Sequence, residues 1–275
     1  MEDNENDYEH WLEVVPREHL DQKFIEKVLK KDPHAISYVP KDLLTQDLCE
    51  VACQANGYLL GVIPEEFVTS QICEIAVGNH EYAISHVPEG MRTESVLRKS
   101  IERNSRNISY APEEMISRDL CEFAISKGSI ALGGIPERFK DYELCKMACE
   151  KNGGALSNVP HILRTEELCS IANKRGRNVL RFIPKELRTH DIMVEACTRN
   201  HKEIRSIPKH MIDVEIAVAA LVSFHRVYEK AGRCSEVNQA WFIGLLPHDV
   251  VADAISIAAE EVGQNVGSES EPGMG

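Results

Sequence analysis

Apolar side chains recur in adjacent pairs, one helical turn apart, along most of this chain. In the segment that follows Pro40 the pairs are Leu48–Cys49 and Ala52–Cys53. The spacing i, i+1, i+4 and i+5 places all four side chains on one face of an α-helix, whereas a half-buried strand would alternate apolar and polar residues. The pattern therefore predicts an α-helix of about ten residues.

The same pattern begins again every 24 residues, each time after a proline. No residue is inserted or deleted between these prolines, which are Pro16, Pro40, Pro64, Pro88, Pro112, Pro136, Pro160, Pro184 and Pro208. A short, fixed period is typical of arrays in which each repeat packs only on its neighbours. We expect an all-α fold, an α-solenoid of about nine helical-hairpin repeats with a C-terminal helical cap.

Both ends of the expected helix carry residue types that begin or end helices. Capping oxygens stand five positions after each proline, at Asp21, Thr45, Thr69, Thr93, Ser117, Asp141, Thr165, Thr189 and Asp213. The helix is expected to stop at Asn or Gly, which tolerate the left-handed turn that ends many helices, as at Asn56–Gly57. A second short helix then leads to the next Val-Pro or Ile-Pro, where proline ends it.

The period breaks after Pro208, and the next matching proline is Pro247. We expect one longer helix over 215–231, followed by helices over 236–245 and 253–262 that cover the last repeat. The expected organisation is an acidic N-terminal segment (1–14), the repeat array (15–212), an atypical repeat with the cap (213–262) and a disordered tail (263–275).

Composition is that of a folded protein in water, with 43% hydrophobic and 27% charged residues. No apolar run approaches the roughly 18 residues that a membrane-spanning helix needs. Residues 1–10 are acidic and lack the regions of a secretory signal peptide. We expect a cytoplasmic protein without a membrane span, with delivery into a host cell by a non-classical secretion route left open.

Eight of the nine cysteines fall at fixed positions of the predicted helices, and the ninth, Cys234, lies outside the repeat. Cys49 with Cys53, and Cys145 with Cys149, share a helix face, but the same positions in other repeats hold Leu97, Val77 or Ile125. Cysteine that exchanges with plain hydrophobic residues indicates buried thiols in a reducing compartment. We expect no metal site, no cofactor and no catalytic group.

The repeated pattern L-x-x-[VI]-P-x-E-[LFM]-x-T-x-[DE]-L-C-x-x-A-[CV]-x-x-N-G resembles the short helical repeats known as a domain of unknown function in bacterial proteins, effector-like ones among them, and in some viruses. The resemblance runs from Val15 to about Ala220. It implies a scaffold that binds other proteins, and it brings no catalytic residue. The segment after Asp213 departs from the pattern.

Candidate binding residues lie where the exposed side of the second short helix should be. Tyrosine and arginine are frequent anchors of protein interfaces. The candidates are Tyr38, Tyr58, Tyr82, His86 and Tyr110 in the first half and Arg181, Phe182, Lys202 and Arg205 in the second. The alternative is that the tyrosines pack between repeats and the arginines are only solvated. The preferred function is a protein-interaction scaffold that binds a partner along a concave repeat face.

Two other functions stay open. A basic band at 174–209 holds ten basic residues against four acidic ones and could bind nucleic acid, although the net charge of −13 disfavours a general polyanion binder. An enzyme site could form between the last repeats and the cap, using His201, His210, His225 or Cys234. No nucleophile, base and orienting group are assembled in the sequence, so we do not expect an enzyme.

Overall fold

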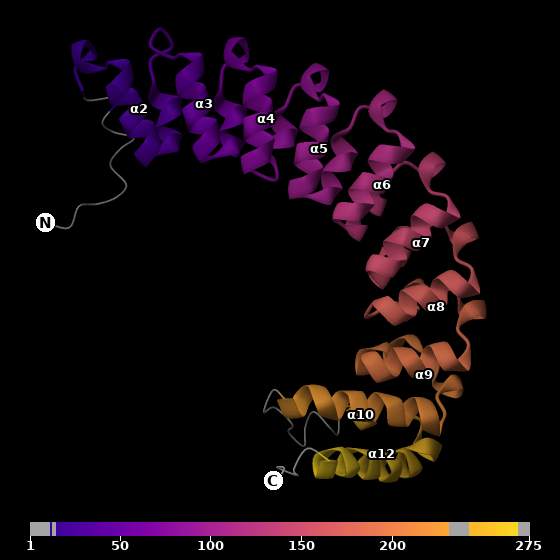
Figure 1. Ribbon diagram of the computed structural model, residues 1–275. Coiled ribbons are helices and arrows are strands. Elements are labelled where there is room, and N and C mark those ends of the chain that lie inside the picture. Colours follow the sequence, from indigo (N-terminus) through magenta and orange to yellow (C-terminus); the bar gives the residue numbers. More distant parts are fainter. Residues whose placement is uncertain (1–11, 13–14, 231–241, 269–275) are drawn as a thin grey trace, which may run out of the picture. The chain divides into compact units, whose positions relative to one another are not determined.

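The computed structural model describes residues 12, 15–230 and 242–268, and within these residues it contains helices and no strand (Figure 1). The all-α prediction is confirmed for this part of the chain. The chain divides into two units, unit 1 up to Phe139 and unit 2 from Lys140. Among the described helices, none is both long enough and apolar enough to cross a membrane.

Long α-helices alternate with short 3-10 helices in both units. Unit 1 contains η1 (Arg17–His19), α2 (Gln22–Lys31), η2 (Pro33–Tyr38), α3 (Gln46–Ala55), η3 (Gly57–Val62), η4 (Glu65–Phe67), α4 (Ser70–Asn79), η5 (Ala83–His86), η6 (Glu89–Met91), α5 (Glu94–Arg103), η7 (Ser105–Tyr110), η8 (Glu113–Met115), α6 (Arg118–Lys127), η9 (Ser129–Gly134) and η10 (Glu137–Phe139). Unit 2 contains α7 (Tyr142–Lys151), η11 (Gly153–Asn158), η12 (His161–Leu163), α8 (Glu166–Arg175), η13 (Leu180–Phe182), η14 (Lys185–Leu187), α9 (His190–Arg199), η15 (His201–Ser206), η16 (Lys209–Met211), α10 (Val214–Lys230) and α12 (His248–Ser268).

The predicted caps begin the long helices. Helices α2 to α9 are each ten residues long, and each follows a Ser, Thr or Asp whose side chain accepts a hydrogen bond from a backbone N–H three residues on. In α2, for example, Asp21 Oδ1 accepts from Phe24 N at 2.7 Å. Such a bond satisfies one of the N–H groups that the first helical turn leaves without a partner.

The prediction that each long helix ends in a left-handed turn is wrong. Asn56 has φ −147° and ψ 103°, which is extended backbone, and Asn152 and Asn200 are alike. Their side-chain oxygens instead accept from the backbone N–H two residues later, so each asparagine caps the following 3-10 helix. The second helix of each repeat is therefore a 3-10 helix, which ends before the next proline.

Glycine follows some of these asparagines because two backbones approach closely there. A Cβ atom at Gly57 would lie 2.0 Å from the carbonyl oxygen of Ala76 in α4, and one at Gly153 would lie 1.8 Å from that of Ala172 in α8. Neither glycine has a positive φ. The requirement is for space rather than for backbone freedom.

The core follows the apolar stripe of the sequence. In α3 the buried residues are Leu48, Cys49, Ala52 and Cys53, and the equivalent positions of α4, α6, α7 and α9 are buried as well. Within each unit a long helix packs on its neighbour in the chain, from α2 to α6 in unit 1 and from α7 to α12 in unit 2 (Figure 1).

The C-terminal part differs from the repeats in helix length. Helix α10 has 17 residues, close to the helix expected over 215–231, and α12 has 21 and packs on α10. The helix expected over 236–245 falls mostly outside the described residues. Helix α12 continues to Ser268, past Gly263, where we expected the tail to begin, because an interior glycine costs a helix only about 1 kcal/mol.

Candidate interaction surface

Four aromatic rings meet on the exposed side of η3 and η5 in unit 1. The ring of Tyr58 lies 4.7 Å from that of His86 and 5.2 Å from that of His80, and His80 lies 5.8 Å from Tyr82. Tyr58 is 48% exposed and Tyr82 is 52% exposed. About half of the surface of each tyrosine is therefore exposed to solvent. Exposed tyrosine rings that already contact other rings are frequent anchors of protein interfaces.

These rings border a hollow of about 520 Å³, here called the aromatic recess, which is lined by Asn56, Tyr58, His80, Tyr82, Ser85 and Tyr110. Local hydrogen bonds hold its rim: His80 Nδ1 accepts from Tyr82 N at 3.3 Å, and Ser85 Oγ donates to Tyr82 O at 2.7 Å. His86 lies against Gly61, where a Cβ atom would come within 2.7 Å of its Nδ1. These bonds hold the backbone of Tyr82 in place, and Gly61 leaves room for the ring of His86.

The structure brings together four of the five candidate residues of the first half. Tyr58, Tyr82 and Tyr110 line the recess, and His86 supports Tyr58. Tyr38, which is 40% exposed, lies on η2 and is not part of the lining. Sequence reasoning missed His80, Asn56 and Ser85. The signal for His80 was available, since it stands where other repeats place Asn or Gly.

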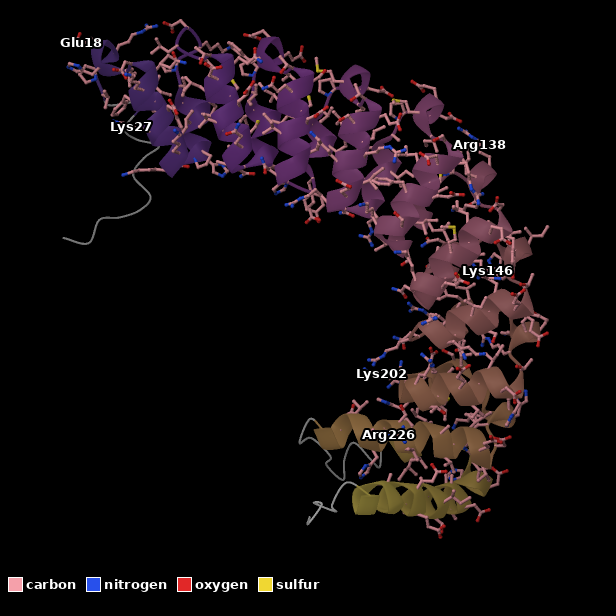
Figure 2. The ribbon with its side chains drawn as sticks, viewed as in Figure 1. Glu18, Lys27, Arg138, Lys146, Lys202 and Arg226 are labelled. Carbon is pink, nitrogen blue, oxygen red and sulfur yellow. The ribbon has the colours of Figure 1, made fainter. Side chains whose placement is uncertain are left out.

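The four candidates of the second half form two groups in unit 2. The guanidinium of Arg181 lies over the ring of Phe182, 4.5 Å from its centroid. Lys202 and Arg205 instead line a cavity of about 270 Å³, here called the basic pocket, together with His201, Tyr228, Phe242 and Leu245. Figure 2 labels Lys202 and, on α10, Arg226.

The basic band at 174–209 is not one uniform surface. Lys174, Arg175 and Lys202 are exposed, but Arg188 turns inward and donates to the backbone oxygens of Ile183 and Ser206. Arg199 faces Glu195, with 3.7 Å between its Nε and a carboxylate oxygen. Arg188 is therefore not available to a polyanion, and Arg199 is partly neutralised by Glu195.

Glu203 is the buried acid of this region. It is only 3% exposed, and its Oε1 accepts from Val179 N at 2.5 Å. Burial raises the pKa of this carboxyl, and the bonds from Val179 and Leu180 oppose the rise. The bonded loop includes Asn178, whose φ of 59° is the one positive value among the described residues other than glycine.

The repeat cysteines are free thiols in the core, as the sequence predicts. Burial raises the pKa of Cys53 and Cys197 to about 12, so these thiols stay protonated at neutral pH. A protonated, buried thiol is a poor nucleophile. Among the described residues no group of three His, Cys, Asp or Glu side chains converges as a metal site would require. Cys234 lies outside the described residues.

The three histidines named for an enzyme site differ in their surroundings. His201 is buried among aromatic rings, His210 is exposed, and His225 is half-buried on α10. Comparison of the chain with protein-family models, curated proteins and solved structures finds no significant match. The resemblance to bacterial and viral repeats therefore stays a prediction.

Proposed function

We propose that this chain is an α-solenoid of about nine 24-residue repeats, capped by α10 and α12, and that it is a scaffold for binding another protein. The supporting observation for the array is the constant 24-residue step between the starts of α3 to α9, from Gln46 to His190. Stacked repeats create extended surfaces on which each unit offers a few side chains to a partner.

The single observation that carries the binding proposal is the aromatic recess. Tyr58 and Tyr82 are large, amphipathic side chains whose rings contact those of His80 and His86. Ser85 Oγ donates to the backbone oxygen of Tyr82 and holds the turn that carries this side chain. Rings held in place before binding lose little conformational entropy when a partner covers them. In unit 2, taken by itself, we propose Arg181, Phe182, Lys202 and Arg205 as further residues that contact a partner.

The partner that fits this surface is an extended polypeptide segment rather than a small molecule. The recess is open, and its lining alternates aromatic rings with the amide and hydroxyl groups of Asn56 and Ser85. Rings bind apolar side chains or prolines of a segment, while the polar groups can bond its backbone. No covalent chemistry is required of any residue in the recess.

A peptide selection tests this function. A random peptide library is displayed against the full-length chain, and the affinities of selected peptides are measured. We expect peptides whose binding falls at least tenfold in the variant Tyr58→Ala with Tyr82→Ala, because each truncation removes a central anchor. Tyr142→Ala is the matched control, since Tyr142 lies in unit 2, where its hydroxyl bonds Glu167 at 2.7 Å. Peptides that bind the double variant and the parent equally would contradict the proposal.

A further inference from the structure

The stretch of chain that builds most of the aromatic recess contains no Lys or Arg. This stretch runs from residue 42 to residue 91, and five of the six residues that line the recess, all but Tyr110, belong to it. It holds eight acidic residues, which are Asp42, Asp47, Glu50, Glu65, Glu66, Glu74, Glu81 and Glu89. The recess is therefore set in a part of unit 1 that carries an excess of negative charge.

Glu81 is the acid that stands next to the recess, since it directly follows His80. It is exposed, and its carboxylate accepts a hydrogen bond from Asn104 Nδ2 at 3.3 Å. Among the residues that the structure describes, Glu81 forms no ion pair, whereas Glu74 pairs with Lys99. An exposed carboxylate that has no cation of its own can pair with a cation that a partner brings.

Three arginines lie in the repeat that follows this stretch. Arg92 donates from Nε to Val87 O at 3.1 Å and from a terminal nitrogen to Tyr110 O at 3.1 Å. Arg103 donates to a backbone oxygen at the end of α4 at 3.2 Å. Arg106 is exposed on η7, but it is not part of the lining of the recess. Two of the three cations are therefore held by backbone oxygens, and the third lies outside the recess.

The rings of the recess offer faces to a cation. The ring of Tyr58 is inclined by 53° to that of His80, and His80 is inclined by 56° to Tyr82, so these rings are not stacked face to face. A cation within about 6 Å of a tyrosine ring centre is attracted to the ring face. Arg92 already lies over the ring of Tyr110, 5.8 Å from its centroid. No cation of the described chain lies over Tyr58 or Tyr82 in this way.

We infer that the aromatic recess binds a cationic side chain, a lysine or an arginine, presented by a basic peptide segment. This inference rests on the proposed function and names the chemical class of the partner. The alkyl stem of the cation packs on Tyr58 and Tyr82 and supplies the apolar contact. Its charge lies over a ring face and pairs with Glu81. The acidic stretch around the recess attracts a basic segment and disfavours an acidic one.

A pair of synthetic peptides tests the cationic occupant. Each has nine residues, Gly and Ser on both sides of a central arginine, or of citrulline, which keeps the shape of arginine without its charge. The full-length chain is titrated with each peptide at constant ionic strength, and the NMR signals of the Tyr58 and Tyr82 rings are followed. We expect saturable shifts and an affinity for the arginine peptide that is higher by at least about fivefold. Equal affinities, or no saturable shift with the arginine peptide, would overturn the inference.

Variants of the chain separate the recess from diffuse attraction by an acidic protein. Glu81→Gln should weaken the arginine peptide severalfold and leave the citrulline peptide unchanged. Glu66→Gln is the matched control, since it removes an exposed acid of η4 outside the lining, and it should change neither affinity. Equal weakening by the two variants would mean that only the net charge matters, and would refute the site.

A second variant addresses the rings themselves. Tyr58→Leu with Tyr82→Leu keeps apolar side chains at two half-exposed positions but removes the ring faces. The affinity for the arginine peptide should fall at least about fivefold, while the helix signal in circular dichroism stays constant. Binding that is as tight as in the parent would exclude a contact between the cation and these rings.

The peptide selection proposed above distinguishes the failure of this inference from the failure of the proposed function. Selected peptides that depend on Tyr58 and Tyr82 and share a Lys or Arg would support both. Selected peptides that depend on the two tyrosines but contain no Lys or Arg would overturn the cationic occupant and leave the binding function in place. If no selected peptide depends on the two tyrosines, both proposals are contradicted.

Discussion

The guanidinium of Arg188 donates a hydrogen bond to the backbone oxygen of Ser206 at 2.8 Å, 18 residues further along the chain. Its Nε also donates to Ile183 O at 2.9 Å, so one side chain joins the C-terminal end of η13 to that of η15. Arg92 and Arg164, at the same repeat position, make the same pair of bonds. Four other repeats place a buried apolar residue there: Leu20, Leu44, Val68 and Ile212.

This alternation predicts that leucine replaces Arg188 better than alanine does. Arg188→Ala loses both bonds and the packing of the side-chain stem, and we expect it to lower the free energy of unfolding by about 1–3 kcal/mol. Arg188→Leu restores apolar packing that Leu44 already provides in another repeat, so its loss should be smaller by at least about 1 kcal/mol. Urea unfolding of both variants measures the difference. Equal losses would show that the two residue types are not alternative solutions for this position.

A pair of glycines in unit 1 gives opposite expectations for the same substitution. Gly57→Ala places a methyl group against the backbone of Ala76, which cannot move without shifting α4, so a loss of about 3 kcal/mol or more is expected. Gly78→Ala adds a methyl group to an exposed helical position with no atom within 4 Å, and a gain of about 0.5–1 kcal/mol is expected. Thermal unfolding of the two variants is the measurement.

The two glycine variants also control for each other, because both lie in the repeats of η3 and α4 and both add one methyl group. If Gly57→Ala were as stable as Gly78→Ala, the backbones of η3 and α4 could not lie as close together as the structure shows.

The long helices could be predicted from the sequence because their determinants are local. The cap at Thr45, the stripe from Leu48 to Cys53 and the proline at 64 all act within a few turns of the chain. The role of Asn56 could not be read in the same way. Asparagine is common both in left-handed helix ends and in caps, and only the backbone angles show which applies.

The candidate sites were predictable only in part, because ring contacts depend on neighbours far away in the sequence. Tyr58 and Tyr82 occupy equivalent positions, so they were expected on one surface, but the support from His86 arises when η3 and η5 pack side by side. His201 was named from the sequence only for an enzyme site, and no local pattern predicted its burial among aromatic rings. It is buried by Phe224 and Phe242, which belong to the irregular C-terminal part.

The buried thiols predict a clear separation in reactivity. Burial raises the pKa of Cys49 to about 11 and that of Cys149 to about 12, and both thiols are inaccessible. At pH 8 in the native state, iodoacetamide should leave all eight repeat cysteines unmodified over hours, whereas unfolding in urea should expose all of them within minutes. Peptide mapping by mass spectrometry identifies each site. Rapid native labelling of Cys49 or Cys149 would contradict the burial of the helix stripe.

The pH dependence of stability follows from the environment of His201. Its pKa falls from an ordinary value of 6.5 to about 4 in the folded chain, first because of burial and then because of Lys202 and Arg205. The unfolded state then binds more protons than the folded state between these two pH values. This contribution to stability is therefore fully present above pH 6.5 and is lost as the pH falls towards 4. Glu203, whose pKa is raised, changes stability in the opposite sense over the acidic range.

His201→Phe isolates the histidine from the other titrating groups. Phenylalanine keeps a ring beside Phe224, Tyr228 and Phe242 but cannot bind a proton, while Glu203 titrates in both proteins. At about 1.4 kcal/mol per pKa unit, the parent should lose on the order of 3 kcal/mol more than the variant between pH 7 and pH 4. Urea unfolding at half-unit pH steps gives the two curves, and their difference should begin near pH 6.5. His210→Phe, at an exposed histidine of the same unit, should reproduce the parent curve. Parallel curves for the parent and His201→Phe would mean that His201 titrates as it does in the unfolded chain, and that its ring is open to water rather than enclosed.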